Sequence, residues 1–339
     1  MYLAAVWPIW ALGGLESHPV VIGGRPDPLL IETDLPNFST TMISYGDQAF
    51  RPKGTIVVYA GLGARSKAFG IGPSLEPILK KAIKEGFAPY AFENPLYNDS
   101  IRQHRLSYFS TTSGQLEWLT NTSKLIASAP NVRQPLIIAG RSTTSALILE
   151  ALHRYLSSGV YSDIFSRVDK ILIMGPVDPR PAEFQKWRKI EIEYLQQRDG
   201  LLDPVAYAAE DTVYKDMRFA TDAVKNVPGL KIPEITFIAG TNDPFATAAE
   251  QVSLARTFQR LHPDTKVKVI VTDTFHNPAA SIEYLGKDGD TVKVKTMKRL
   301  SPILSELFSE KRGNEPGFSI VIQPEVQHLV NACVLSLKF

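Results

Sequence analysis

The segment PLIIAGRSTTSALILEAL, residues 135–152, constrains the fold more than any other part of the sequence. Leu136 to Ala139 form an apolar run long enough for a buried strand, and Gly140 lets the chain turn. Apolar residues then recur at helical spacing, at Ala146, Leu147, Leu149 and Leu152. The segment therefore predicts a strand, an abrupt turn and a helix, with Ser142 at the bend.

The GRSTTS turn is a degenerate form of the GxSxG pattern, with Thr144 in place of the second glycine. In that pattern a tight strand-to-helix turn projects the serine hydroxyl above the sheet edge. The N–H of the next residue, Thr143, lies at the helix N-terminus and is a candidate donor to an oxyanion. Thr144 adds bulk that a neighbouring element must tolerate. An ordinary turn, in which Ser142 only caps the helix, is the alternative.

Two later apolar strands also end in polar turns that carry candidate catalytic residues. PEITFIAGTNDPF, residues 233–245, reaches Asp243 in a Gly-Thr-Asn-Asp-Pro turn. KVKVIVTDTFHNP, residues 266–278, reaches His276 after its strand. The chain order is therefore Ser142, Asp243, His276, and each residue comes just past the carboxyl end of a predicted strand.

This order, with the sequences GRSTTS, GTNDP and FHNP, resembles the α/β-hydrolase superfamily over roughly residues 19 to 310. The resemblance implies that Ser142 is the nucleophile, Asp243 the acid that orients the base, and His276 the general base and acid. Asp178, in MGPVDPRP after the preceding strand, is a second candidate for the acid, because some hydrolases use that position. Asp273 is too close to His276 in the same loop to orient its ring.

The loop that begins YAGLG lies where related hydrolases place the first oxyanion-hole donor. The backbone of Leu62 is the candidate donor, and Gly61 and Gly63 let the backbone turn its N–H groups toward the site. A plain glycine-rich turn is the alternative. The sequence ENPLY, residues 93–97, resembles a branch of the same superfamily, which implies that Glu93, Asn94 and Tyr97 line the floor of the site or hold the loop by hydrogen bonds. A solvent-facing turn around Pro95 is equally compatible.

Apolar strands alternate with helical stretches along most of the chain, which argues for a mostly parallel sheet with helices on both faces. Further elements are expected as a strand pair within 29–46 that turns near Pro36, strands within 54–63, 87–92 and 170–174, and helices within 74–85 and 113–128. We expect an α/β-hydrolase fold with its core in residues 1–175 and 233–339.

Residues 176–232 change to charged, amphipathic helices without strands, and the resembled family inserts a helical cap at this point. The aromatic residues of this segment, Trp187 and Tyr194 among them, would roof an acyl pocket and set its chain-length preference. Packing of the cap helices on one another is the alternative. The residues assigned to substrate binding are Gly61, Gly63, Arg141, Trp187 and Tyr194.

Composition excludes several classes of partner. The chain has 339 residues, of which 44% are hydrophobic, enough for a large core in one domain with a cap. Its 37 basic and 35 acidic residues form no polybasic run, so nucleic acid and anionic membranes are not expected as principal partners. Cys333 is alone, and the sequence has no CxxC, HExxH, GxGxxG or Walker pattern, so no metal or other cofactor is expected.

The first residues, MYLAAVWPIWALGG, are apolar but contain no Lys or Arg, and they include Pro8. The run is shorter than a membrane-spanning helix, so we expect a segment packed on the domain and no integral membrane segment. A cytoplasmic location is expected, with secretion as the alternative. The sequence does not indicate an oligomeric state.

Taken with the resemblance, these residues predict a serine hydrolase that cleaves an ester or thioester of a small-molecule acyl substrate through an acyl-enzyme on Ser142. Two other classes remain open. An acyltransferase would pass the acyl group to a second substrate in preference to water. A non-catalytic binding protein would keep the hydrolase fold without the catalytic geometry, and the irregular elbow leaves this class open.

Overall fold

A computed structural model of the whole chain describes most of its regular structure. The described residues are 29–35, 38–44, 52–59, 61, 78–79, 81–92, 94–97, 105–129, 132–177, 186, 189, 205, 208–209, 211–213, 227–243, 245–274, 284–285, 291–292 and 317–324.

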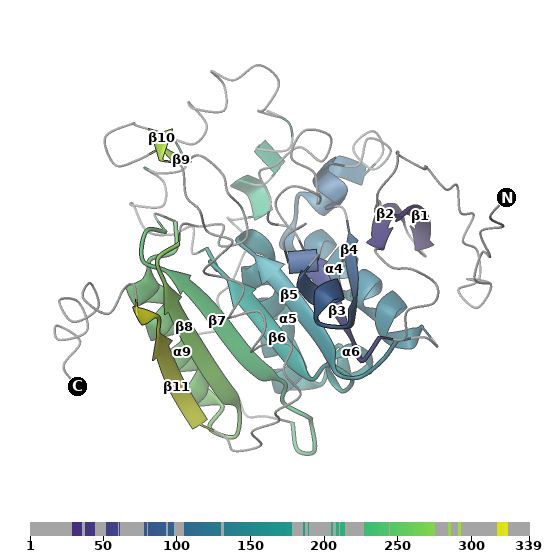
Figure 1. The fold of residues 1–339 in the computed structure, drawn as a ribbon. Coiled ribbons are helices and arrows are strands. Elements are labelled where there is room, and N and C mark those ends of the chain that lie inside the picture. The colour runs from purple at the N-terminus through teal and green to yellow at the C-terminus, as the bar shows by residue number, and fades with distance from the viewer. Residues whose placement is uncertain are drawn as a thin grey trace, which may run out of the picture.

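One sheet of nine strands forms the centre of the molecule, in the order β1-β2-β4-β3-β5-β6-β7-β8-β11 (Figure 1). β1 and β2 are antiparallel, β2 pairs antiparallel with β4, and all other neighbours are parallel. The strands are β1 Leu29–Leu35, β2 Phe38–Ser44, β3 Gly54–Tyr59, β4 Phe87–Phe92, β5 Leu136–Arg141, β6 Lys170–Met174, β7 Glu234–Gly240, β8 Lys266–Thr272 and β11 Gly317–Ile322. A separate two-stranded sheet pairs β9 Tyr284–Leu285 with β10 Thr291–Val292.

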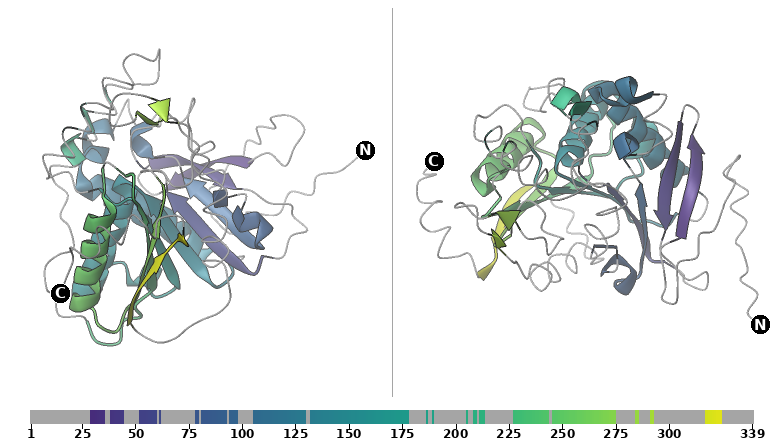
Figure 2. Two further views of the ribbon diagram at one scale, coloured as in Figure 1. Left: turned by 60° about the vertical axis from the view of Figure 1, so that its left-hand side comes forward. Right: turned by 90° about the horizontal axis from the view of Figure 1, so that it is seen from above.

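The helices cover both faces of the sheet. Those with defined bounds are α4 Thr112–Ser128, α5 Thr143–Ser158, α6 Ser162–Phe165, α9 Ala248–Leu261 and the short 3-10 helix η2 Pro95–Tyr97. α4, α5 and α9 lie on one face (Figure 2). Residues 78–79 and 81–84 are helical, and their apolar side chains pack against the other face. β3, β5 and β6 are buried along their whole length, as expected for parallel strands covered on both sides.

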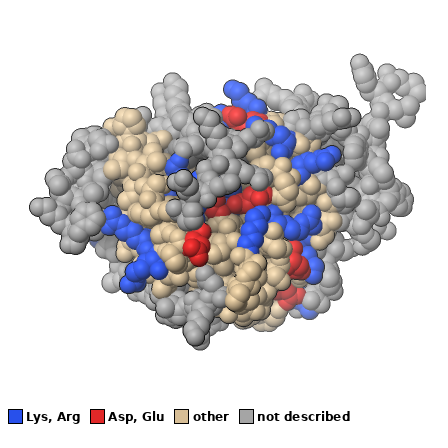
Figure 3. Space-filling model, turned by 90° about the horizontal axis from the view of Figure 1, so that it is seen from below, with Lys and Arg blue, Asp and Glu red and all other residues tan. Residues whose placement is uncertain are grey.

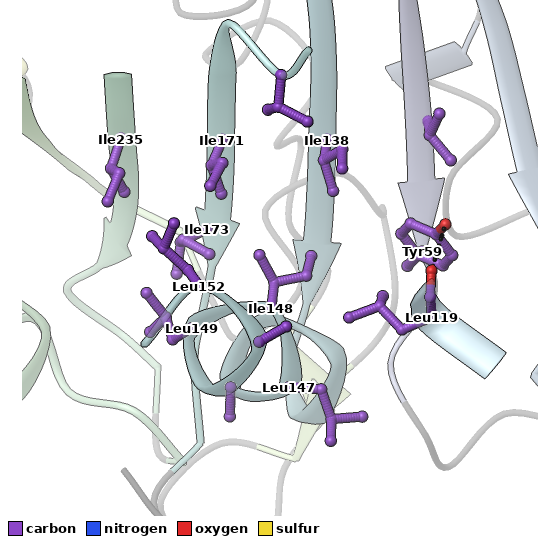
Figure 4. Packing of buried hydrophobic residues seen from close by; sticks show 14 of the residues in the cluster. Tyr59, Leu119, Ile138, Leu147, Ile148, Leu149, Leu152, Ile171, Ile173 and Ile235 are labelled. Atoms are coloured by element: carbon purple, nitrogen blue, oxygen red, sulfur yellow. Dashed lines mark hydrogen bonds between the residues drawn. The ribbon is translucent and has the colours of Figure 1, made fainter. Parts of the chain in front are cut away.

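Two hydrophobic clusters fill the space between these layers. On the face of α4, α5 and α9, isoleucines of the strands meet the leucines of α5, and Figure 4 shows Ile138, Ile171 and Ile173 opposite Leu149 and Leu152. Each such side chain contributes about 1.5–3 kcal/mol when it is fully buried. The second cluster lies on the opposite face and contains the alternate residues of the same strands, including Ile137 and Ala139 of β5.

Tyr59 joins the sheet to α4 at the end of β3. Its hydroxyl hydrogen-bonds with the hydroxyls of Thr122 at 2.8 Å and Ser123 at 2.7 Å, and its ring packs edge-on against Trp118. Burial raises the pKa of the Tyr59 phenol well above its ordinary value, so this group stays protonated. The contact fixes the end of β3, from which the loop containing Gly61 departs.

Charged side chains of both signs lie next to one another on the face seen from below in Figure 3. At the amino ends of the central strands, Lys231 pairs with Asp169 at 2.9 Å and Lys266 with Glu234 at 3.1 Å. No helix in the described part of the chain is long and apolar enough to cross a membrane. The described residues also contain no group of three His, Cys, Asp or Glu side chains placed to hold a metal ion.

The predicted strand pair in 29–46, the strands in 54–63, 87–92 and 170–174, and the helix in 113–128 are confirmed. Pro36 lies outside the described residues. β11 was not expected, and it extends the sheet past residue 310, beyond the predicted limit of the hydrolase resemblance. Helix α9 was also not predicted from the sequence, although Thr247 and Glu250 form a capping box at its start.

The described residues of the segment 176–232 include helical positions at 186, 189, 205, 208–209 and 211–213. Ala209 and Val213 are buried in the cluster that contains α4, and the Thr112 hydroxyl donates to the Val213 carbonyl at 3.3 Å. Because α4 begins at Thr112, this contact places Val213 beside the start of that helix.

Candidate active site

Ser142 occupies the turn between β5, which ends at Arg141, and α5, which begins at Thr143. Its backbone angles are φ 57° and ψ −128°. Of the described residues other than glycine, only Ser142 and Tyr161 have positive φ. A side chain in this region of backbone space costs about 1–3 kcal/mol, and such strain is concentrated at functional sites. The structure therefore places the predicted nucleophile at a strained strand-to-helix turn.

The strained turn is held by the end of the neighbouring strand, β6. The Ser142 N–H donates to the Met174 carbonyl at 2.9 Å. The Ser145 hydroxyl donates to the same carbonyl at 3.1 Å and accepts from the Met174 N–H at 3.0 Å. Three hydrogen bonds thus fix the first turn of α5 to β6, which is how a surrounding structure can maintain an unfavourable backbone conformation.

Gly140 permits the close approach of α5 to β5. A Cβ at this position would lie 2.5 Å from Ile148 Cδ1, closer than real Cβ atoms lie, and 3.0 Å from the Ser145 nitrogen, which is tighter than most real contacts. The residue at the second glycine position of the pattern, Thr144, is fully buried and is accommodated in the packing. The tight contact of this elbow is therefore made at Gly140, and Thr144 leaves the turn intact.

The Ser142 side chain does not cap α5. The residue occupies the N-cap position but makes no side-chain hydrogen bond to the first turn of the helix. The hydroxyls of Thr111 and Thr247, by contrast, cap α4 and α9 by accepting from Gly114 and Glu250. The interpretation of Ser142 as a helix cap is therefore wrong.

Gly61, two residues after β3, lies against the elbow. Tyr59 pairs with Gly140 in the sheet, and two residues later Gly61 reaches the level of Ser142. A Cβ at Gly61 would lie 2.7 Å from Ser142 Cβ and 3.0 Å from the Arg141 carbonyl. A larger residue would clash here, so glycine permits the close contact between position 61 and the candidate nucleophile.

Asp243 is buried in the turn after β7, with only 4% of its surface exposed. Its Oδ1 accepts hydrogen bonds from the backbone N–H groups of Phe245 at 2.9 Å and Ala246 at 3.0 Å. These two bonds fix the orientation of the carboxyl group. Helix α9 then begins directly after this turn, at Ala248.

The turns after β7 and β8 are joined beyond the end of the sheet. The Thr241 N–H donates to the Thr272 carbonyl at 2.9 Å, and the Asn242 N–H to the Thr274 carbonyl at 3.1 Å. The Asn242 side-chain amide also donates to Asp273 Oδ1 at 2.6 Å. Asp273 therefore has a positioning contact with the Asp243 turn.

Sheet register brings these turns to a single edge. Arg141 of β5 pairs with Met174 of β6, Met174 pairs with Ile238 of β7, and Gly240 of β7 pairs with Thr272 of β8. The turns that carry Ser142 and Asp243 therefore follow strands separated only by β6. The carboxyl edge of a parallel sheet is the usual place for ligands.

The remaining predicted residues, Leu62, Gly63, Asp178, Trp187, Tyr194 and His276, lie outside the described residues.

Arg141 is buried on the face of β5 opposite α5. It follows Ile137 and Ala139 on that face and is 7% exposed. Its Nε and Nη1 atoms meet no hydrogen-bond acceptor in the described part of the structure. A Cβ at Gly61 would lie 3.4 Å from Arg141 Nε, so the guanidinium stem lies beside the same glycine that touches Ser142.

Asn94 of the ENPLY sequence stabilises its loop by buried hydrogen bonds. The residue is buried, its side-chain amide donates to Gln115 Oε1 at 2.9 Å, and its Oδ1 accepts from the Leu96 N–H at 3.0 Å. Gln115 in turn donates to the Phe109 carbonyl at 2.7 Å. The hydrogen-bonding interpretation of Asn94 is therefore confirmed, and a solvent-facing turn is wrong at this residue. Glu93 lies outside the described residues.

Solved structures share this architecture. An esterase of Pyrococcus furiosus matches with a TM-score of 0.52 and 14% identity, over 86% of this chain and 99% of its own. A 2,6-dihydroxy-pseudo-oxynicotine hydrolase matches with a TM-score of 0.54 and 12% identity, over 87% and 72%. The chain has an α/β-hydrolase fold.

A third α/β-hydrolase match, esterase 2 of Thermogutta terrifontis, is described as phosphoramylated by tabun. It has a TM-score of 0.51 and 13% identity, over 86% of this chain and 97% of its own. No protein-family model matches the sequence, and no curated protein matches it. The identities are low, so these likenesses show the fold alone.

Proposed function

We propose that this protein is a serine hydrolase that cleaves an ester or thioester through an acyl-enzyme on Ser142. The observation that carries the proposal is the conformation of Ser142, which is strained, fixed by β6 and not used to cap α5. A strained turn of this kind presents a nucleophile at the edge of a sheet. The same geometry counts against a non-catalytic binding protein, because the irregular motif has kept the turn.

The proposed reaction has two steps. His276 takes the proton of the Ser142 hydroxyl as its oxygen attacks the acyl carbon, and Asp243 orients the imidazole and stabilises its cation. The backbone N–H groups of Thr143 and Leu62 hold the oxyanion. The intermediate then expels the alcohol or thiol, which takes the proton from His276. Water activated by His276 attacks the acyl-enzyme, which releases the acid and restores Ser142.

The assignment of Asp243 is supported by its burial and by the two backbone N–H groups that fix its carboxyl group. It is also supported by the hydrogen bonds that join its turn to the turn after β8, from which His276 follows two residues past Thr274. Asp178 remains the alternative acid. Asp243→Asn is expected to slow turnover strongly and Asp178→Asn to leave it nearly unchanged, and the opposite pattern would reverse the assignment.

We also propose that the segment 176–232 forms a cap over the core of residues 1–175 and 233–339, except for its last residues, because the Val227 N–H bonds to Leu156 and Lys231 pairs with Asp169 at the amino edge of the sheet. The contact of Val213 with Thr112 supports this placement, because Thr112 begins α4 at the carboxyl edge of the sheet. Trp187 and Tyr194 would then roof the acyl pocket. Their replacement by alanine should change the preference between short and long acyl chains more than it changes thermal stability. An unchanged preference in both variants would contradict the cap.

Hydrolysis of short p-nitrophenyl esters tests the nucleophile. Ser142→Ala should lower kcat by several orders of magnitude, because loss of a positioned nucleophile typically has this effect. Ser158→Ala, at the exposed end of the same helix, is the matched control and should keep wild-type turnover. Circular dichroism should show that both variants are folded. Wild-type turnover in Ser142→Ala would show that the nucleophile is elsewhere.

A further inference from the structure

Arg141 carries a buried charge that the described protein does not neutralise. Its guanidinium is permanently charged, and its Nε and Nη1 meet no acceptor among the described residues. None of the ion pairs of the described residues includes it. Buried charges are normally paired, because removal of a lone charge from water is costly. Two buried guanidinium nitrogens without an acceptor among the described residues are therefore an exception, which a bound anionic group would explain.

The position of Arg141 places this charge beside the candidate nucleophile. One point in space, the Cβ that Gly61 lacks, lies 2.7 Å from Ser142 Cβ and 3.4 Å from Arg141 Nε. The two atoms are thus separated by less than the sum of these distances. On the other side, Met174 pairs with Arg141 and contributes an apolar side chain to the same face. The charge therefore lies at the end of an apolar face, beside the residue that carries the reacting hydroxyl.

We propose that Arg141 binds a carboxylate on the acyl group of the substrate, so that the substrate is a half-ester or half-thioester of a short dicarboxylic acid. The inference rests on the proposed function. A guanidinium matches a carboxylate with two parallel hydrogen bonds, which an ammonium group cannot reproduce. The leaving group must depart to solvent, whereas Arg141 is 7% exposed, so the group that it holds belongs to the acyl part. The short separation of Ser142 and Arg141 selects a short acid.

Three esters test the inference by pH-stat, because each releases one acid on hydrolysis. Monoethyl succinate carries the carboxylate on its acyl part. Ethyl 4-methylpentanoate replaces that carboxylate with an uncharged group of similar shape, and 4-acetoxybutanoate carries a carboxylate on its alcohol part. The wild type is expected to show a higher kcat/KM for monoethyl succinate than for the other two.

The variants Arg141→Met and Arg141→Lys locate the cause of this preference. Arg141→Met should lower the ratio of kcat/KM for monoethyl succinate over ethyl 4-methylpentanoate by about 30-fold or more, as expected for a lost buried charge pair. Arg141→Lys should retain part of the ratio. Arg133→Met, at the exposed approach to the other end of β5, is the matched control and should keep the wild-type ratio.

The outcomes separate this inference from the proposed function. If the wild type has the same kcat/KM for ethyl 4-methylpentanoate as for monoethyl succinate, the inference is overturned and the proposed function is not. This outcome does not depend on whether the variants fold. An unchanged ratio in folded Arg141→Met does the same. A preference for 4-acetoxybutanoate that Arg141→Met abolishes overturns the assignment to the acyl group. Failure to hydrolyse any of the three esters, together with failure of a fluorophosphonate to label Ser142, overturns the proposed function as well.

Discussion

Because the backbone at Ser142 is strained, we predict that the Ser142→Gly variant has a larger free energy of unfolding than the Ser142→Ala variant. Both substitutions remove the buried hydroxyl, but only glycine removes the Cβ that makes φ 57° and ψ −128° unfavourable. Relief of the strain is worth about 1–3 kcal/mol, and the greater freedom of glycine in the unfolded chain offsets about 0.5–1 kcal/mol of it. Ser142→Gly should therefore be more stable than Ser142→Ala by about 1 kcal/mol.

Ser145 provides the matched control, three residues along the same helix. Both substitutions there lose the same hydrogen bonds to Met174, but the backbone is helical. Glycine in a helix is less stable than alanine by about 1 kcal/mol, so the order of the two variants should reverse. The glycine-minus-alanine difference in the free energy of unfolding should therefore be about 2 kcal/mol larger at position 142 than at position 145.

Urea unfolding followed by tryptophan fluorescence measures both pairs. A change of 1 kcal/mol moves the midpoint by about 0.3 M for a chain with a large change in exposed surface. The expected order is Ser142→Gly above Ser142→Ala and Ser145→Ala above Ser145→Gly. If alanine is at least as stable as glycine at position 142, the backbone there is not strained and the elbow interpretation is refuted.

Three further substitutions test other contacts. Gly140→Ala should destabilise the protein by about 1–3 kcal/mol, since its Cβ would displace the buried Ile148 side chain and press on the Ser145 backbone; an unchanged urea midpoint would contradict the packing. Gly61→Ala should lower kcat for p-nitrophenyl esters about 100-fold by displacing the loop from Ser142, and full activity would show that the approach is unimportant. Burial, and then the neighbouring His153, lower the pKa of His262, so its contribution to stability is present above about pH 6.5 and is lost as the pH falls. His262→Phe should therefore lose less stability than the wild type between pH 7 and 5, and equal losses would contradict the burial of an uncharged ring.

The elbow could be predicted from the sequence because its determinants are local. The apolar run before Gly140, the helical spacing after it and the serine between them all fall within one segment. The same holds for the strands that precede Asp243 and His276. Local pattern and chain order were sufficient to predict the α/β-hydrolase fold, because buried parallel strands are nearly continuous apolar runs.

Features that depend on distant parts of the chain could not be predicted in this way. β11 pairs with β8 across more than forty residues, and its alternating exposure makes it look like any short edge strand. The bonds from Ser142 and Ser145 to Met174 use its backbone groups, so the identity of residue 174 carries no signal of them. The lack of acceptors for Arg141 Nε and Nη1 among the described residues is likewise a property of the surroundings of this side chain.

Fluorophosphonate labelling of the purified full chain, followed by peptide mass spectrometry, tests the central claim most directly. The reagent forms a stable adduct with an activated serine. The account predicts one adduct on the peptide that contains Ser142 and none in Ser142→Ala. An adduct on another serine, or no adduct on folded wild-type protein, would contradict it.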